Sequence, residues 1–409
     1  MSNYPIFSVM GIEIEYMLVD SDTLEVQPKN DQILHDLAGL QVNEVVLGDI
    51  AASNELVMHV IELKNNGPKP PKAPIASQFQ QAIMHLQPVL ERYHLQLLPT
   101  GAHPWMNPML ETKRWPHGNN AIYEQYDSIF NCQGHGWANL QSMHINLPFA
   151  DDPEFDELHN LIRLLLPLMP ALGASSPLLE GKKTGFLDSR LHCYGKNQER
   201  IPCIAGDIIP DIIHSEEQYG REILEPIYQA ISPFDPEGIL QHEWINSRAA
   251  IAKFEFGAIE IRLLDTQECV NADIAIAYAT LAILKAWRNL GQTRHLDKTV
   301  DTRTLKAIYE QTLIEGLDVS IDDRALLEHW QITKKRAMTL RDIWSLLIER
   351  VSHDLDQTTQ LALEHILNYG NLSERILKAC DNDFSRKKLH RVYRQLGDCL
   401  VTNQPFKTL

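Results

Sequence analysis

The first clear pattern in the chain is an alternation of apolar and acidic residues near its N-terminus. Residues 11–19, GIEIEYMLV, have the two-residue period of a β-strand, so we predict a strand there. In such a strand Glu13 and Glu15 lie on one face, about 7 Å apart, and the apolar residues between them lie on the other. Two carboxylates this close repel one another, and in a half-buried sheet they stay charged only beside a cation. The pattern leaves two interpretations: ligands for a hard divalent metal, or the solvated face of an edge strand.

A second alternating segment places an imidazole on one strand face. In residues 140–148, Ser142, His144 and Asn146 share a face, and the apolar residues between them point to the core. A neutral imidazole can ligate a metal beside carboxylates, and an asparagine side chain can hold a carboxylate or phosphate by hydrogen bonds. Most strand histidines bind no metal, so this segment gains its meaning only together with the others.

The segment 253–268 combines an acid and a base on one strand face. Glu260 and Arg262 lie on the same side of the predicted strand, with Ile259 and Ile261 on the other. A carboxylate beside a guanidinium suits a site that holds both a cation and an anion, of which Mg-nucleotide is the commonest example. A cross-strand salt bridge is the alternative interpretation.

A further acid-bearing segment, residues 54–64, is also predicted to be a strand. Glu55 and Glu62 lie seven residues apart in it, so they would face opposite ways in one uninterrupted strand. A turn or bulge near Glu55 would be needed for both side chains to reach one site. Glu62 is therefore the firmer candidate.

Helical periodicity predicts helices over residues 74–95 and 156–169, between the strands. From residue 272 onward the strand signals end, and helices with charged outer faces take over. These helices would pack on the sheet as scaffold. Their predicted ranges are 274–290, 304–313, 324–330, 340–355, 359–369 and 386–396.

Composition narrows the class of protein. The chain has 409 residues, 44% of them hydrophobic, which is enough to bury a large core. Its 37 basic and 54 acidic residues give a net charge of -17, which argues against a nucleic-acid or anionic-membrane partner. The sequence shows neither a leader segment nor a run of about 20 apolar residues, so we predict a cytoplasmic protein outside the membrane. Its six cysteines lack CxxC spacing and are expected to be free thiols.

A basic, glycine-containing loop at residues 181–200 stands out in this acidic chain. It contains Lys183 and Arg190, and it follows a run of small residues at 171–177 that would let a ligand approach the backbone closely. Arg190 is a candidate for fork-like binding of a substrate carboxylate or phosphate, and a surface ion pair is the alternative.

Together these segments resemble the glutamate–cysteine ligase family 2, also called carboxylate–amine ligases. The resemblance runs from about residue 11 to residue 265 and more loosely into the helical tail. The motifs that carry it are GIEIEYMLV at 11–19, LQSMHINLPF at 140–149, GASSPLLEGKKTGFLDSR at 173–190 and FGAIEIRLLD at 256–265.

The resemblance implies a fold similar to that of glutamine synthetase. This is an α+β fold in which a curved antiparallel sheet forms a funnel flanked by helices, here over residues 1–270, with a helical portion over residues 271–409 packed on the same domain. By resemblance, Mg²⁺ or Mn²⁺ would be bound by Glu13, Glu15, Glu55, Glu62, His144 and Glu260. The residues implied to bind ATP or a substrate anion are Arg262, Arg190, Asn146 and Lys183. Glu260, Arg262 and Arg190 are implied to be catalytic.

The implied reaction is ATP-dependent formation of a C–N bond, with L-glutamate and L-cysteine as the default substrates of glutathione biosynthesis. The glutamate γ-carboxylate would attack the γ-phosphorus of ATP, and the amine would displace phosphate from the resulting γ-glutamyl phosphate. Metals and Arg262 would neutralise the developing charge. The chain has no Walker-type glycine loop, so metals and arginines would have to bind the phosphates.

Three alternatives accompany this interpretation. The first is a ligase of the same fold that joins glutamate, or another acid, to a different amine. The second is a metal-dependent hydrolase, which is disfavoured because HExxH and clustered histidine pairs are absent. The third is a non-catalytic nucleotide- or metal-binding homologue, which would be expected to have lost one or more of Glu13, Glu15, Glu260 and Arg262. The sequence does not decide whether the chain forms a homo-oligomer.

Overall fold

The computed structural model describes residues 4–290, 300–333 and 337–407, and an antiparallel sheet lies at its centre. The strand order is β2-β3-β4-β1-β6-β10-β9, and β5 pairs with a further part of β1. The strands are β1 (Gly11–Asp20), β2 (Glu44–Leu47), β3 (Ile50–Asn54), β4 (Val60–Asn65), β5 (Leu95–Leu98), β6 (Ser142–Pro148), β9 (Ala250–Lys253) and β10 (Ala258–Asp265). The predicted α+β class, with an antiparallel sheet flanked by helices, is confirmed.

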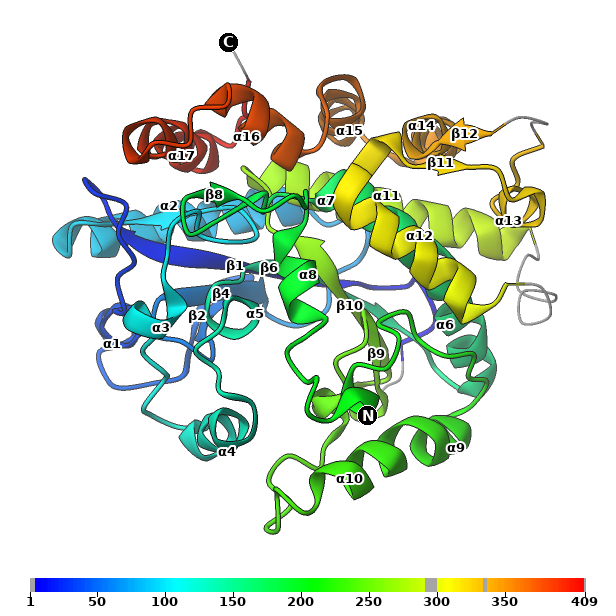
Figure 1. Ribbon diagram of the computed structural model, residues 1–409, viewed down its shortest axis with the longest axis horizontal. Coiled ribbons are helices and arrows are strands. Elements are labelled where there is room, and N and C mark those ends of the chain that lie inside the picture. The colour runs from blue at the N-terminus through cyan, green and yellow to red at the C-terminus, as the bar shows by residue number, and fades with distance from the viewer. Residues whose placement is uncertain (1–3, 291–299, 334–336, 408–409) are drawn as a thin grey trace.

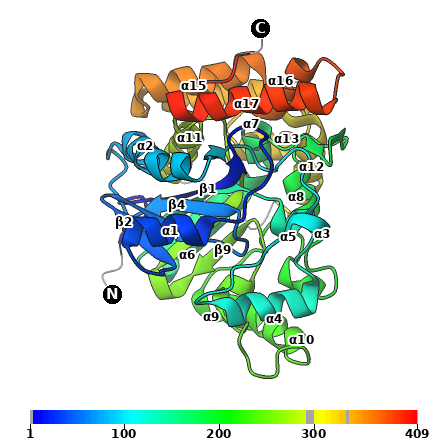
Figure 2. The same ribbon diagram turned by 90° about the vertical axis from the view of Figure 1, so that its left-hand side faces the viewer.

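One face of this sheet is apolar and fully covered. Ile12, Ile14 and Tyr16 of β1 are 0% exposed on that face, as the alternation predicts. Two long helices pack over it, α2 (Ile75–Arg92) and α11 (Val270–Asn289). Figures 1 and 2 show both helices on the same side of the sheet.

The C-terminal helices form a further layer outside α2 and α11 (Figures 1 and 2). This layer contains α14 (Leu340–Val351), α15 (Gln357–Tyr369), α16 (Leu372–Cys380) and α17 (Arg386–Thr402). On the opposite side of the sheet lie α4 (Asn120–Phe130), α9 (Glu216–Tyr219) and α10 (Glu225–Ile231). The remaining described α-helices are α1 (Asn30–Ala38), α3 (Pro108–Glu111), α5 (His135–Ala138), α6 (Asp152–Leu165), α7 (Met169–Gly173), α8 (Ser189–Tyr194), α12 (Thr302–Glu315) and α13 (Arg324–His329).

The predicted strand over residues 54–64 is interrupted near Glu55, as a shared site for Glu55 and Glu62 requires. β3 ends at Asn54, a turn occupies residues 55–59, and β4 begins at Val60. The turn is fixed from inside, because the buried His59 places its Nε2 2.7 Å from the carbonyl oxygen of Ala138. The chain therefore reverses between Glu55 and Glu62.

Two elements of the C-terminal portion are absent from the sequence prediction. α16 begins at Asn371, whose side chain forms a capping box with Glu374; this Asn-x-x-Glu signal is readable in the sequence. A short pairing between β11 (Ser320–Ile321) and β12 (Met338–Thr339) interrupts the helices. The division near residue 270 stays a prediction, since one apolar core contains residues from both portions.

α11 is long and apolar enough to cross a membrane, and it is the one described helix of which this is true. However, 78% of its most apolar window is buried inside the fold, where the helix contacts α2, α6, α14 and α15. Packing on all sides explains its composition, because a helix surrounded by protein has no polar face to present.

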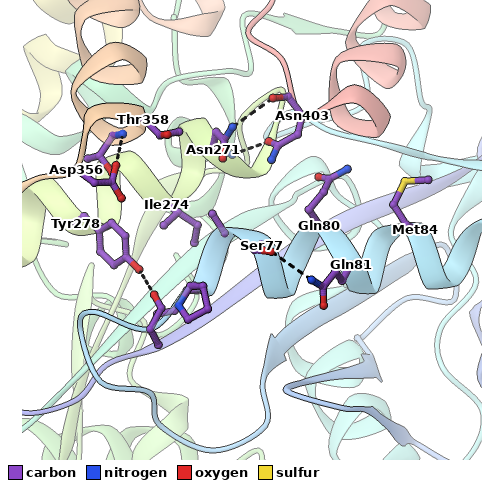
Figure 3. Close-up of a pocket in the computed structure, with 15 residues that line it drawn as sticks. Ser77, Gln80, Gln81, Met84, Asn271, Ile274, Tyr278, Asp356, Thr358 and Asn403 are labelled. Carbon is purple, nitrogen blue, oxygen red and sulfur yellow. Dashed lines mark hydrogen bonds between the residues drawn. The ribbon is translucent and has the colours of Figure 1, made fainter.

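A cavity of about 600 Å³ with a mixed polar and apolar lining lies among the covering helices, between α2, α11, α15 and the end of α17 (Figure 3). The backbone N–H of Asn271 donates to Oδ1 of Asn403 at 2.9 Å, which links the start of α11 to the end of α17. The hydroxyl of Tyr278 donates to the carbonyl of Ala73 at 2.9 Å. None of the residues predicted to bind metal or substrate lines this cavity.

A buried ion pair anchors the C-terminal segment, and we expect its loss to be costly. Arg375 and Glu268 are each 1% exposed, and Glu268 also accepts the backbone N–H of Phe406 at 3.1 Å. Removing one partner leaves a buried charge unpaired, so Arg375→Leu should lower the free energy of unfolding by about 3–5 kcal/mol. Urea denaturation followed by circular dichroism measures this change. Arg221→Ala, at an exposed ion pair, should leave the midpoint unchanged. An unaltered midpoint for Arg375→Leu would contradict the expectation.

Candidate functional site

The strand register assembles acidic residues on the face of the sheet opposite to the apolar one. Glu15 of β1 stands directly across from Glu62 of β4, and Glu13 stands directly across from His144 of β6. Glu260 projects beside them from β10, the next strand. Directly opposed side chains of an antiparallel pair share one face. The four adjacent strands β4, β1, β6 and β10 thus bring residues from distant parts of the sequence onto one face of the sheet. We call this surface of Glu13, Glu15, Glu62, His144 and Glu260 the acidic floor.

Glu13, His144 and Glu260 form the first group of possible metal ligands. One ligand atom from each lies within 4.8 Å of the others. Nδ1 of His144 is 3.2 Å from Oε2 of Glu13 and 3.9 Å from Oε1 of Glu260, and Asn146 donates to Glu13 at 2.9 Å. Burial disfavours the charged imidazole, but the hydrogen bond to Glu13 and the charge of Glu260 outweigh it and raise the pKa of His144.

Glu15, Glu55 and Glu62 form the second group, and their ligand atoms also lie within 4.8 Å of one another. The turn that ends β3 brings Glu55 to Glu62, so the break required by their seven-residue separation is present. Ser53 donates to Glu62 at 2.8 Å, and both the backbone N–H and the hydroxyl of Ser142 donate to Glu15, at 2.7 and 3.0 Å. These bonds fix the orientation of the two strand carboxylates.

The second group carries strong mutual repulsion. Burial raises the pKa of Glu55 well above its ordinary value, and the charges of Glu62 and Glu15 add to this rise. Burial and the charge of Glu13 raise the pKa of Glu62 to about 7, although Lys64 opposes them. Such carboxylates favour either protonation or a cation between them. A donor set of carboxylates and one imidazole fits hard divalent cations such as Mg²⁺ and Mn²⁺.

Glu260 is held between two cationic side chains, Lys253 and Arg262. Both form ion pairs with it, and Nε of Arg262 donates to its Oε1 at 3.0 Å. Although burial opposes ionisation, Arg262, Lys253 and His144 lower the pKa of Glu260 below its ordinary value. Glu260 and Arg262 therefore share a strand face as the alternation predicts, and they form an ion pair within the acidic floor.

A cleft of about 310 Å³ lies over this floor, and its walls carry aromatic rings. The ring centroid of Tyr126 is 5.4 Å from that of Trp137 and 5.9 Å from that of Trp244. Tyr123 lines the same wall and accepts a hydrogen bond from Asn54 at 3.1 Å. The cleft thus combines an ionic floor with an apolar wall.

A second depression, a groove of about 730 Å³, lies at the start of β1 and is mostly apolar. Its apolar lining includes Tyr4, Met10, Pro68, Pro148 and Phe256. Glu13 and Lys253 line both the groove and the cleft, so the two depressions meet at the first group of ligands.

The structure brings all but one of the predicted site residues together. The cleft is lined by Glu13, Glu15, Glu55, Glu62, His144, Arg190, Glu260 and Arg262. Asn146 lines the adjoining groove. Lys183 lies outside both, exposed on the hairpin of β7 (Leu178–Leu179) and β8 (Lys182–Lys183), because Gly181 at φ 73° makes a tight turn there. Ligand binding by the assembled residues stays a prediction.

Arg190 makes contacts that neither sequence interpretation describes. Its side chain is 2% exposed, its Nε pairs with the buried Asp265, and its Nη2 donates to the carbonyl of Leu263 at 2.7 Å. The surface ion pair considered as its alternative role is therefore wrong, because the ion pair is buried. Its binding of a substrate anion stays a prediction.

Lys253 and the aromatic wall were missed by the sequence analysis. Lys253 reaches Glu260 because a hairpin through Gly257, at φ 59°, pairs β9 with β10. The turn residues 254–257 between two β-rich runs were the available signal. Tyr123 and Tyr126 are spaced i, i+3 on α4, but Trp137 and Trp244 lie on other segments, so helical period alone could not have brought these rings together.

Metal stabilisation of this site should depend on pH through Glu62. The pKa of Glu62 is about 7 against an ordinary 4.5, so the metal-free native state holds this proton more tightly than the unfolded state. Protonation of Glu62 therefore stabilises the native state fully below about pH 4.5, and this stabilisation is lost as the pH rises to about 7. A cation that binds the ionised carboxylate opposes this loss, so Mn²⁺ should raise Tm more at about pH 8 than at about pH 5.5.

Scanning calorimetry at both pH values, with and without Mn²⁺, measures the difference. Glu62→Gln should remove most of it, whereas Glu217→Gln, a glutamate whose side chain is 90% exposed, should not. Equal Mn²⁺ shifts at the two pH values would count against the assignment of Glu62 as a ligand.

Comparison with known proteins places these features in a family. The family model described as glutamate–cysteine ligase family 2 (GCS2) matches residues 9–395. A protein of Archaeoglobus fulgidus named "Uncharacterized protein" is 32% identical over 401 residues, covering 97% of this chain and 100% of that protein. A Chloroflexus aurantiacus protein named "Putative glutamate--cysteine ligase 2" is 25% identical over 418 residues, covering 98% of this chain and 92% of its own length.

Solved structures share the fold at low identity. A glutamate–cysteine ligase from Francisella tularensis in complex with AMP aligns with a TM-score of 0.62 and 14% identity, over 97% of this chain and 89% of that chain. A bifunctional glutathione synthetase from Pasteurella multocida aligns with a TM-score of 0.52 and 13% identity, over 96% of this chain and 53% of that chain. At these identities the likeness concerns the fold alone.

Proposed function

Because this chain belongs to the glutamate–cysteine ligase family 2, we propose that it is an ATP-dependent carboxylate–amine ligase that joins L-glutamate to L-cysteine. The observation that carries the proposal is the shared floor, on which two groups of possible metal ligands lie beside Arg262 and Lys253. Phosphoryl transfer relies on positioned cations around the phosphate groups, and these residues supply the means to hold or provide them.

The two groups of ligand atoms would each hold a divalent cation. When bound, Mg²⁺ or Mn²⁺ would neutralise phosphate oxygens that otherwise face an acidic floor and would make the γ-phosphorus more electrophilic. Ser53 and Ser142 keep the carboxylates of Glu62 and Glu15 oriented before any ligand binds, because their hydrogen bonds come from the protein itself.

In the proposed reaction, a γ-carboxylate oxygen of glutamate attacks the γ-phosphorus of ATP. The bond to the β,γ-bridging oxygen breaks, ADP leaves and γ-glutamyl phosphate forms. The amine then attacks the carbonyl carbon, inorganic phosphate leaves with the bonding electron pair, and the nitrogen loses a proton. Arg262 would neutralise charge on the transferring phosphoryl group, and the cleft walls would limit hydrolysis of the acyl phosphate.

We assign the nucleoside of ATP to the groove at the start of β1. A mostly apolar pocket suits a flat base, and the rings of Tyr4 and Phe256, 43% and 68% exposed, lie at its edge. Glu13 and Lys253 line both depressions, so the phosphates would extend from the groove onto the acidic floor. The nucleotide bound by the Francisella ligase, which shares this fold, supports a nucleotide here.

A different amine in place of cysteine is the second candidate. The observation that favours it is the aromatic wall of Tyr126, Trp137 and Trp244, since ring faces attract ammonium groups of many shapes. The acid, the phosphoryl donor and the intermediate stay the same in this version.

ADP release by the purified protein with ATP, Mg²⁺ or Mn²⁺, and L-glutamate, with and without L-cysteine, tests the proposal. We expect cysteine-dependent ADP release and γ-glutamylcysteine by mass spectrometry. Glu15→Gln should lower the rate by about 10²–10³-fold, because it removes a charge that would hold a cation at the phosphates. Glu217→Gln is the matched control and should keep the full rate.

Each other outcome has a defined meaning. ADP formed only with another amine from a panel would retain the ligase mechanism and replace the acceptor. Nucleotide binding without ADP release, for every acid and amine tested, would overturn the enzymatic proposal and favour a binding role.

A further inference from the structure

We infer that Arg190 is a positioning residue, which holds the β-bulge that presents Arg262 to the cleft. The inference rests on the proposed function for the role of Arg262, but the geometry of the bulge does not depend on that function. It gives Arg190 a task distinct from the anion binding predicted from the sequence.

The bulge lies in β10, at Arg262 itself. Ile261 pairs with Ile145 of β6, but the next described pair is Leu264 with Met143. Arg262 and Leu263 therefore both stand opposite His144, which is the arrangement of a β-bulge. On the other edge of β10, the N–H of Arg262 donates to the carbonyl of Ala249 at 3.0 Å.

The bulge changes which residues of β10 face the cleft. Glu260 faces it before the bulge and Arg262 faces it from within the bulge, and in a regular strand the next residue to do so would be Leu264. Instead Leu264 pairs with Met143, and Asp265 pairs with Ser142, whose hydroxyl points to the acidic floor. The extra residue thus places Asp265, rather than Leu264, on the side of Arg262.

One side chain bridges this irregular stretch. Nη2 of Arg190 donates to the carbonyl of Leu263, inside the bulge, at 2.7 Å, and its Nε pairs with Asp265, just after the bulge. Both charged groups are 2% exposed or less, so neither bond competes with solvent. Since Nε and Nη2 already donate within the protein, that edge of the guanidinium cannot bind a phosphate or carboxylate in a two-pronged manner.

Asp265 itself has almost no freedom to move. It accepts hydrogen bonds from the backbone N–H of Ser175 and from the hydroxyl of Ser176, both at 2.8 Å. Gly101 packs against it so closely that an added Cβ would lie 2.2 Å from the carboxyl carbon. The contacts explain two sequence motifs, since the small residues near 175 and the basic loop near 190 meet at this carboxylate.

The support continues along α8, the helix that carries Arg190. Asp188 caps this helix by accepting the N–H of Leu191 at 2.8 Å, and Tyr194 from the same helix lines the cleft with Arg262. One short helix therefore contributes both the bond to the bulge carbonyl and a side chain of the cleft.

A double-mutant cycle between Arg190 and Arg262 tests the inference. We expect Arg190→Lys to lower kcat by about 10–100-fold while KM for ATP and glutamate changes by less than about 3-fold. In an Arg262→Lys background, adding Arg190→Lys should cost little more, because its effect passes through Arg262. Two results together would overturn the inference in favour of direct substrate binding: a raised KM in Arg190→Lys, and a loss of kcat in the double variant equal to the product of the two single losses.

Mn²⁺ titration supplies a measurement that needs no turnover. Nε of Arg262 donates to Glu260 and so helps to orient this member of the first ligand group; a displaced bulge should therefore misplace the carboxylate and weaken Mn²⁺ binding several-fold. If the protein proves inactive as a ligase but Arg190→Lys weakens Mn²⁺ binding, the positioning role stands while the proposed function falls. Unchanged Mn²⁺ binding in a folded Arg190→Lys variant would overturn the inference.

Two further variants separate positioning from loss of folding. Gly101→Ala displaces Asp265 without changing any charge, and it should reproduce the loss of kcat and the weaker Mn²⁺ binding. Arg375→Lys is the matched control, because Arg375 is also a buried arginine that bonds one carboxylate and backbone carbonyls. It should lower stability but leave kcat and Mn²⁺ binding unchanged. A normal kcat in Gly101→Ala would overturn the inference.

Discussion

The repulsion between Glu15 and Glu62, which stand directly opposite each other on adjacent strands, is the constraint on which this structure depends. Like charges in such a pair destabilise a sheet, and the buried Glu55 increases the repulsion. The hydrogen bonds from Ser53 and Ser142 do not remove this charge; they only fix its direction. Such a site fits a bound cation, because carboxylates this close together favour either protonation or a cation between them.

Apolar packing on the other face of the same sheet offsets the repulsion between these carboxylates. Side chains of β1 alternate between the two faces of the sheet. The acidic ones point into the cleft, and Ile12, Ile14 and Tyr16 point into a continuous apolar core. α11 is buried over most of its length in that core, and the C-terminal helices close it from outside. Burial of large apolar side chains contributes about 1.5–3 kcal/mol each, so a core of this size can offset the repulsion among the carboxylates on the opposite face.

The sequence predicted those parts of the site that depend on local period, and it failed where distant segments decide. Alternation showed which side chains share a face within each strand, whereas the grouping of Glu13, His144 and Glu260 as ligands came from the family resemblance. The register that sets Glu15 against Glu62 is a property of pairing between strands, and no single strand contains it. The turn before β4 depends on a buried contact of His59 with Ala138, 79 residues away, so residues 54–64 alone could not show whether the strand is interrupted near Glu55.

The contacts of Arg190 show the same limit, because they join it to Leu263 and Asp265 in a distant segment of the sequence. Both oxygens of Glu260 are already engaged, one by Arg262 and the other by Lys253. A cation that takes this carboxylate as a ligand would share its oxygens with Arg262 and Lys253 and weaken both ion pairs, so the guanidinium of Arg262 would then depend less on Glu260 for its position. The bulge bonded by Arg190 stays in place when Glu260 changes partner, because its bonds run to Leu263 and Asp265. A fixed backbone can therefore keep Arg262 directed at the cleft while its side chain exchanges one anionic partner for another.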